Sequence, residues 1–184
     1  MLFAIQVFWP RDPAMAWLPL VRELVGNAPG RHSPEAMAAL LRDLCGLLVA
    51  ALPDAQLGLW EYVEDPEQAS EDYQSWCEGT VIDVDEESEH ADPEEDAYAF
   101  VTLLLLLEDG GEAQARIWSA SEQIPDGEEA NRRAYERWLD LIPNLNFRTV
   151  ESTAIFVRPG AEGLGVMAPM LAEEHYHHLV PLIG

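Results

Sequence analysis

The sequence contains no lysine. Its 10 basic residues are all Arg and stand against 34 Asp and Glu, so the formal net charge is −24. A charge of this size repels the phosphates of nucleic acids and nucleotides. A GC-rich genome or adaptation to high salt would explain the missing lysine, but salt adaptation spreads acidic residues over every surface. We therefore expect no nucleic-acid partner. The acids of this chain are concentrated instead of spread evenly.

Cysteines and long apolar runs are also scarce. The two cysteines, Cys45 and Cys77, are too few for a disulfide framework. The apolar run 100–107 is far shorter than the roughly 20 residues of a membrane-spanning helix. The first apolar run, 1–9, has no basic region before it and ends at Pro10. These absences predict a cytoplasmic protein with reduced thiols and no membrane partner.

No motif of a known reaction or cofactor is present. The sequence has no GxSxG, no HExxH and no dinucleotide fingerprint, and the glycine-containing run 160–167 lacks the lysine of a phosphate loop. Cys77 is surrounded in sequence by Glu71, Asp72, Glu78 and Asp83, which should raise its pKa and make it a poor nucleophile. Cys45 is expected in the core. The sequence favours a non-enzymatic protein without a cofactor.

The length and hydrophobic content predict one folded domain. The chain has 184 residues, of which 48% are hydrophobic, and a globule of this size buries about 70% of its unfolded surface. Alternating or continuous apolar patterns predict strands, and apolar residues spaced by three and four predict helices. Expected strands are 2–9, 56–63, 98–107, 113–119 and 147–158. Expected helices are 14–26, 34–52 with Ser33 as N-cap, 127–142 with Asp126 as N-cap, and 169–178.

This order of elements predicts an α+β fold. We expect a single domain over residues 1–184, with a mixed, mainly antiparallel sheet of about five strands and helices packed against it. Glycines at 110 and 111 predict a hairpin that pairs 98–107 with 113–119. An acidic loop or insert is expected at about 64–97, and its stretch beginning at Thr80 starts like a strand.

The strongest functional signal is a gap in the basic residues. Residues 43–115 contain 21 of the acids and no Arg or Lys. Ion pairing inside this segment is impossible, so self-repulsion opposes folding unless distant Arg residues, counter-ions or a basic partner offset it. This pattern points to a docking surface for a basic protein.

Aromatic residues lie among these acids, a composition suited to gripping Arg-rich surfaces. For the aromatic residues, packing in the core is the alternative interpretation. The candidate partner-binding residues are Glu61, Tyr62, Glu64, Asp65, Tyr73, Trp76, Asp83, Asp85, Glu86, Glu87, Glu89, Glu94 and Glu95.

Two segments offer candidate metal ligands. Counted from Asp83, acids fall at positions 3, 5, 7 and 12 of a calcium loop, but Ser88 replaces the turn glycine at position 6 and Pro93 occupies position 11. In the tail, Glu174, His175 and His178 are candidate transition-metal ligands on a helix. Because the three histidines of this tail would point in different directions, we assign no metal.

We therefore predict a binding protein whose segment 61–96 docks a basic protein partner. Its most concrete form is an inhibitor or immunity protein against a basic toxin or nuclease, since such inhibitors must bind fast. The alternatives are an adaptor or assembly subunit of a larger complex and a metal-dependent protein using Asp, Glu and His. The sequence does not specify an oligomeric state.

Overall fold

The computed structural model describes residues 1–12, 15–28, 33–86, 97–159, 166–172 and 176–184, and residues 79–86 by their backbone alone. Within these ranges the chain forms an antiparallel sheet with helices on both faces, which confirms the predicted α+β class. The strands are β1 (Leu2–Pro10), β2 (Leu57–Val63), β3 (Ala97–Leu107), β4 (Val150–Arg158), β5 (Val166–Met167) and β6 (Val180–Pro181). The α-helices are α1 (Trp17–Gly26), α2 (Pro34–Ala51), α3 (Pro66–Glu86), α4 (Glu112–Ser121) and α5 (Arg132–Leu141).

The first strand lies in the middle of the sheet. The order is β4-β3-β1-β2-β6, with β5 paired to the start of β3. Because β1 has neighbours on both sides and helices on both faces, all but its last residue are buried, as its unbroken apolar run predicts. Its one polar side chain, Gln6, donates from Nε2 to Thr102 Oγ1 of β3 at 2.9 Å.

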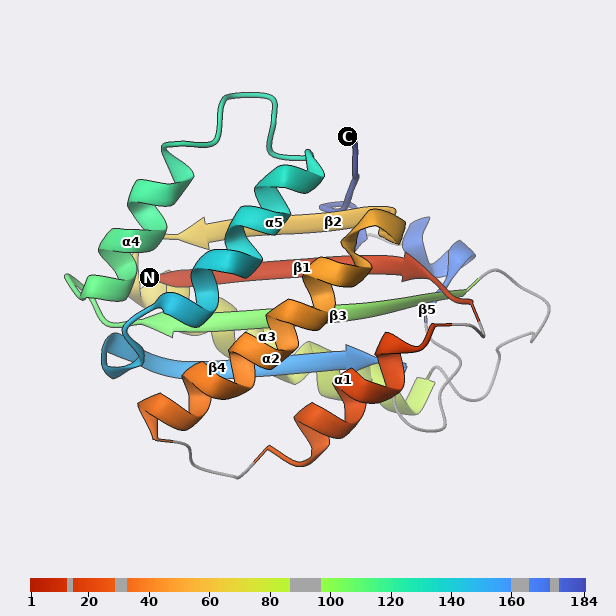
Figure 1. The fold of residues 1–184 in the computed structure, drawn as a ribbon, viewed down its shortest axis with the longest axis horizontal. Coiled ribbons are helices and arrows are strands. Elements are labelled where there is room, and N and C mark those ends of the chain that lie inside the picture. Colours follow the sequence, from red (N-terminus) through yellow and green to blue (C-terminus); the bar gives the residue numbers. More distant parts are fainter. Residues whose placement is uncertain (13–14, 29–32, 87–96, 160–165, 173–175) are drawn as a thin grey trace.

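Two unequal layers cover the sheet. Helices α1, α2, α4 and α5 lie in front of it in Figure 1, and α3 lies behind it. We call the first side the four-helix face and the second the α3 face. The larger core lies under the four-helix face, where Phe3, Ile5 and Val7 of β1 meet α2 and α5. On the α3 face, Leu2 and Ala4 pack under α3, and Phe8 packs against Tyr176 of the C-terminal segment.

Helix α2 forms as the sequence predicts. Ser33 accepts a hydrogen bond from the Ala36 N–H at 3.1 Å, and Pro34 occupies the first turn, where its missing N–H costs nothing. Leu41, Leu44 and Leu48 share the buried side. By length and composition, 34–54 is also apolar enough to cross a membrane. Here one side of that helix packs on the sheet.

The predicted hairpin after β3 is wrong. The chain turns at Gly110, whose φ is +68°, and then enters helix α4 instead of a strand at 113–119. Ala113 and Ile117, which are fully buried, lie one helical turn apart and anchor this helix to the core. Strand β3 therefore pairs with the distant β4.

Two further helix boundaries differ from the prediction. Helix α5 begins after Asn131, whose side chain accepts from the Arg133 N–H, and not after Asp126. The intervening residues form turns, with Gly127 at a φ of +85°. In the tail, a 3₁₀ helix at Ala168–Ala172 replaces the start of the α-helix predicted at 169–178.

Candidate docking surface

Helix α3 occupies most of the predicted acidic insert. It begins at Pro66, and Asp65 caps it by accepting the Gln68 N–H at Oδ1 over 2.9 Å. The strand-like start predicted at Thr80 is therefore wrong, because α3 continues to Glu86. The same helix contains Asp83 and Asp85, which would have opened the calcium loop. A helical backbone at these positions does not match such a loop.

One side of α3 is apolar and packs on the sheet. Ala69 is fully buried, and Tyr73, Trp76 and Cys77 pack partly buried beside it. Their spacing of four, three and one residues places them on one side of a helix. The Tyr73 hydroxyl lies 2.7 Å from Ser152 Oγ, which ties α3 to β4. Two of the three aromatic residues predicted for partner contact, Tyr73 and Trp76, thus pack on the sheet and hold the helix in place.

The opposite side of α3 is acidic. Glu67, Glu71 and Glu78 are exposed and fall within about 40° of one another around the helix axis at 3.6 residues per turn. In the part of the chain that the structure describes, none of the three has an ion-pair partner. These three residues were not predicted from the sequence, because the strand-like start at Thr80 obscured this helix, although the spacing of 69, 73 and 76 was a readable signal.

The helices on the two faces of the sheet differ in charge. On the four-helix face, α1 and α4 each contain one Arg and one acid, α2 one Arg and two acids, and α5 three Arg and two acids. Those four helices are therefore neutral in sum. Helix α3 contains seven acids and no basic residue. Three of these acids lie in its last two turns, where a negative charge opposes the helix dipole.

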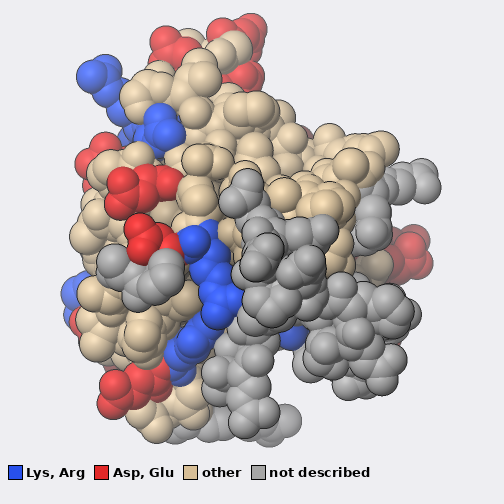
Figure 2. Space-filling model, turned by 90° about the vertical axis from the view of Figure 1, so that its right-hand side faces the viewer, with Lys and Arg blue, Asp and Glu red and all other residues tan. Residues whose placement is uncertain are grey.

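Basic side chains gather elsewhere. Figure 2, which views the end of the molecule at the right of Figure 1, shows Arg side chains next to acidic ones. Arg22 of α1 donates from Nε to the Pro159 carbonyl at 2.9 Å. Burial lowers the pKa of Arg22, and the charge of nearby Arg11 lowers it further. Mixed charge at this end contrasts with the uniformly acidic α3.

The candidate partner-binding residues do not share one surface. Glu64 and Asp65 are exposed at the turn before α3. Glu61 lies on the α3 face, where burial raises its pKa and Asp72 raises it further. Tyr62 lies on the four-helix face, where its ring and that of Trp118 form a T-shaped pair at a centroid distance of 5.8 Å.

The remaining candidates lie beyond the described side chains. Asp83, Asp85 and Glu86 belong to α3, described there by backbone alone, and Glu87, Glu89, Glu94 and Glu95 fall outside the described residues.

Neither cysteine is set up as a nucleophile. Burial raises the pKa of Cys45 to about 12, with a further contribution from Asp140. Burial also raises the pKa of Cys77; its contact with Tyr73 lowers the pKa, and Glu78 raises it. A thiolate is therefore disfavoured at both positions. The expected acidic neighbour contributes at Cys77, but burial is the larger cause.

Among the described residues no group of three or more His, Cys, Asp and Glu is placed to hold a metal ion. Of the predicted tail ligands, Glu174 and His175 lie outside the described residues. His178 lies over the α3 face, with its ring 5.9 Å from that of Trp76 and Nε2 3.5 Å from Gln6 Oε1. Its described contacts tie the tail to α3 and β1.

Comparisons with models of protein families, with curated proteins and with solved structures find no match to this chain.

Proposed function

We propose that this protein is a non-enzymatic binding protein that docks a basic protein partner on the outer side of α3. One observation carries the proposal: α3, a helix of 21 residues without a single basic residue, is the α-helix that covers this face of the sheet in the described part of the chain, while the four helices opposite are neutral in sum. Repulsion along such a helix destabilises the isolated protein, and a basic partner relieves it.

The most concrete form is an inhibitor or immunity protein that acts in the cytoplasm against a basic toxin or nuclease. Glu67, Glu71 and Glu78 supply carboxylates in a row, with Gln74 between them on the same side. Carboxylates bind Arg side chains through charge-assisted hydrogen bonds. Opposite charge also speeds association, which an inhibitor of a damaging enzyme needs.

Capture from a native cell extract at low salt tests the proposal. The variant E67Q/E71Q/E78Q removes three exposed carboxylates from α3. Its matched control, E23Q/D43N/E136Q, removes three exposed carboxylates from α1, α2 and α5 on the four-helix face. Both variants change the net charge equally, so only the location differs.

The expected result is a basic protein retained by the wild type and the control, lost from the α3 variant, and released as salt rises. Equal retention by both variants would contradict docking on α3. Loss from both would show that net charge alone is responsible. A basic enzyme whose activity the wild type suppresses would identify the inhibitor form.

A further inference from the structure

Strand β4 forms one edge of the sheet, and its outer backbone groups can be identified. The Leu107 N–H donates to the carbonyl of Met1, just before β1, at 2.8 Å, so the backbone groups of the odd-numbered residues of β3 face β1 and those of the even-numbered ones face β4. Strand β4 pairs Leu104 with Ala154 and Leu103 with Ile155. The N–H and C=O groups of Thr153, Ile155 and Val157 therefore point outward, away from β3.

This edge lacks the usual protection against a further strand. Natural edge strands are commonly interrupted by charged residues, proline or bulges. Residues 152–157 read STAIFV, without a charge or a proline, and the register shift of β4 lies before them, near Val150. Just after the C-terminal end of β4, Arg22 of α1 donates a hydrogen bond to the carbonyl of Pro159. In the described part of the chain β4 has β3 as its strand partner, so its outer donors and acceptors between these limits are open.

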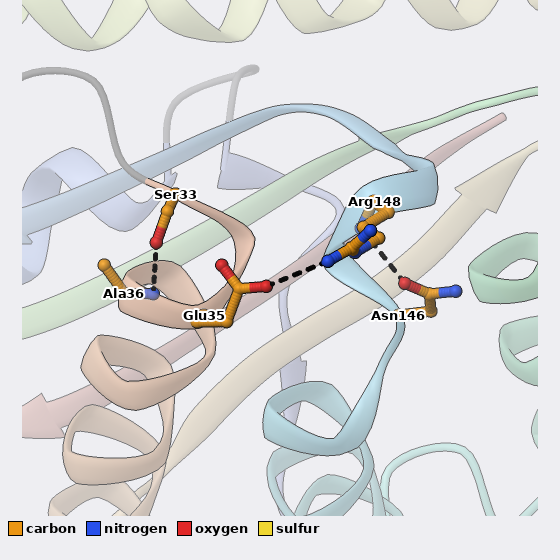
Figure 3. Close-up of polar contacts among 5 residues, drawn as sticks. All are labelled: Ser33, Glu35, Ala36, Asn146 and Arg148. Carbon is orange, nitrogen blue, oxygen red and sulfur yellow. Dashed lines mark hydrogen bonds and ion pairs between the residues drawn. The ribbon is translucent and has the colours of Figure 1, made fainter.

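A groove runs beside the same edge. It has a volume of about 840 Å³ and lies between β4, the end of α1 and the start of α2. Val25, Met37, Leu40 and Ile155 give it an apolar lining, and each of them is partly exposed. Arg148, just before β4, and Glu35, in the first turn of α2, lie beside the groove. Their side chains form an ion pair at 3.3 Å (Figure 3).

We infer that β4 accepts an extended segment of the basic partner as an additional antiparallel strand. The inference rests on the proposed function and extends it from α3 to a second contact. The open N–H and C=O groups of β4 can pair only with an extended segment. The apolar lining of the groove favours a segment that has apolar side chains on the side facing the groove. In such a pair, residues opposite Thr153 and Ile155 direct their side chains to the four-helix face, where the groove lies.

The net charge favours a basic segment over a second copy of this chain as the added strand. A second copy of this chain would bring together two molecules that each carry −24, and their repulsion opposes pairing. A basic segment is attracted instead. Ser152 bonds Tyr73 of α3 on the other side of β4, so β4 lies directly beside the acidic helix. A partner seated on α3 can therefore extend one segment along β4.

A short capped peptide of alternating Arg and Val is the probe. Its twin carries a methyl group on the nitrogen of every Val, which preserves charge and side chains but removes the N–H groups that would face β4. The protein variant Thr153→Pro removes an outward N–H without breaking the ladder to β3, since proline is tolerated at such edge positions. Thermal melting checks that this variant folds.

Binding by fluorescence anisotropy and amide hydrogen exchange are measured together. We expect the peptide to slow exchange at Thr153, Ile155 and Val157. Methylation of the peptide or Thr153→Pro should weaken binding at least about tenfold, the loss of one or two hydrogen bonds to desolvated groups. Equal binding of the methylated twin, or unchanged exchange of those amides at saturation, overturns strand addition.

The two proposals fail separately. Salt-dependent binding that is lost in E67Q/E71Q/E78Q, with unchanged exchange in β4, contradicts strand addition and leaves docking on α3 standing. Slowed exchange in β4, with binding that is unaffected in the α3 variant, supports strand addition and contradicts the role of α3. Absence of any peptide binding at low salt overturns both.

Discussion

Glu61 of β2 lies close enough to Asp72 of α3 for the charge of Asp72 to act on it. Burial raises the pKa of Glu61, and the charge of Asp72 raises it further. A buried carboxyl with a carboxylate neighbour binds its proton more tightly in the folded state than in the unfolded state. Ionised Glu61 therefore destabilises the fold at neutral pH.

Glu61→Gln should accordingly raise the melting temperature at pH 7. Because the pKa of Glu61 is raised in the folded state, ionised Glu61 destabilises the protein at pH values above that pKa. The destabilisation disappears as the pH falls through the folded-state pKa toward the ordinary pKa of a glutamate. Melting curves of wild type and variant, recorded from neutral to acidic pH, should converge at the acidic end. A constant difference at all pH values would mean that the charge of Glu61 is not the cause. Glu64→Gln, at an exposed position nearby, is the control.

Gly58→Ala should destabilise the fold. A Cβ atom at Gly58 would lie 2.7 Å from Cε1 of Tyr135, whose ring is fully buried. Overpacking of this kind costs about 1–3 kcal/mol. Gly46→Ala is the matched control, because its Cβ meets nothing within 4 Å and its position in α2 favours alanine by about 0.5–1 kcal/mol. Urea unfolding should shift in opposite directions for the two variants.

Tyr73→Phe should loosen α3 without removing its apolar contacts. It deletes the hydroxyl that lies 2.7 Å from Ser152 Oγ, and the free energy of unfolding should fall by about 0.5–1.5 kcal/mol. Ser152→Ala and the double variant complete a mutant cycle. If the two single effects add fully in the double variant, this hydrogen bond does not stabilise the protein.

Added salt should stabilise the protein, and the acids of α3 should contribute more to this stabilisation than the same number of acids on the other helices. Screening weakens the repulsion among its seven acids. The melting temperature of the wild type should therefore rise between low and physiological sodium chloride. The rise should be smaller in E67Q/E71Q/E78Q than in E23Q/D43N/E136Q. Equal rises would mean that repulsion is spread over the whole surface.

Local signals in the sequence predicted much of the fold. The apolar run of β1 and the Ser33 and Pro34 signals of α2 depend on neighbouring residues alone, and both elements form where expected. The Gly110 turn also depends on local sequence, but a glycine turn can lead into a strand or a helix. Only the spacing of Ala113 and Ile117 distinguishes them.

The candidate docking surface was predictable only in part. The absence of basic residues between 43 and 115 can be read directly from the sequence. The helical nature of α3 was obscured because Val81, Ile82 and Val84 suggest a strand, whereas its inward side is set by Ala69, Tyr73 and Trp76. Which face of the sheet α3 covers, and which edge β4 forms, depend on pairing between strands about 50 residues apart.

The uneven charge of the helices on the two faces also contributes an electric dipole roughly perpendicular to the plane of the sheet. Its negative end lies at α3, and the neutral helices lie at the other end. In the field of a cationic surface such a molecule rotates before contact, so more of its encounters begin with α3 leading. Reorientation reduces the angular search that slows protein association. The arrangement of layers would thus set how often a collision is productive, even where it leaves the strength of the final complex unchanged.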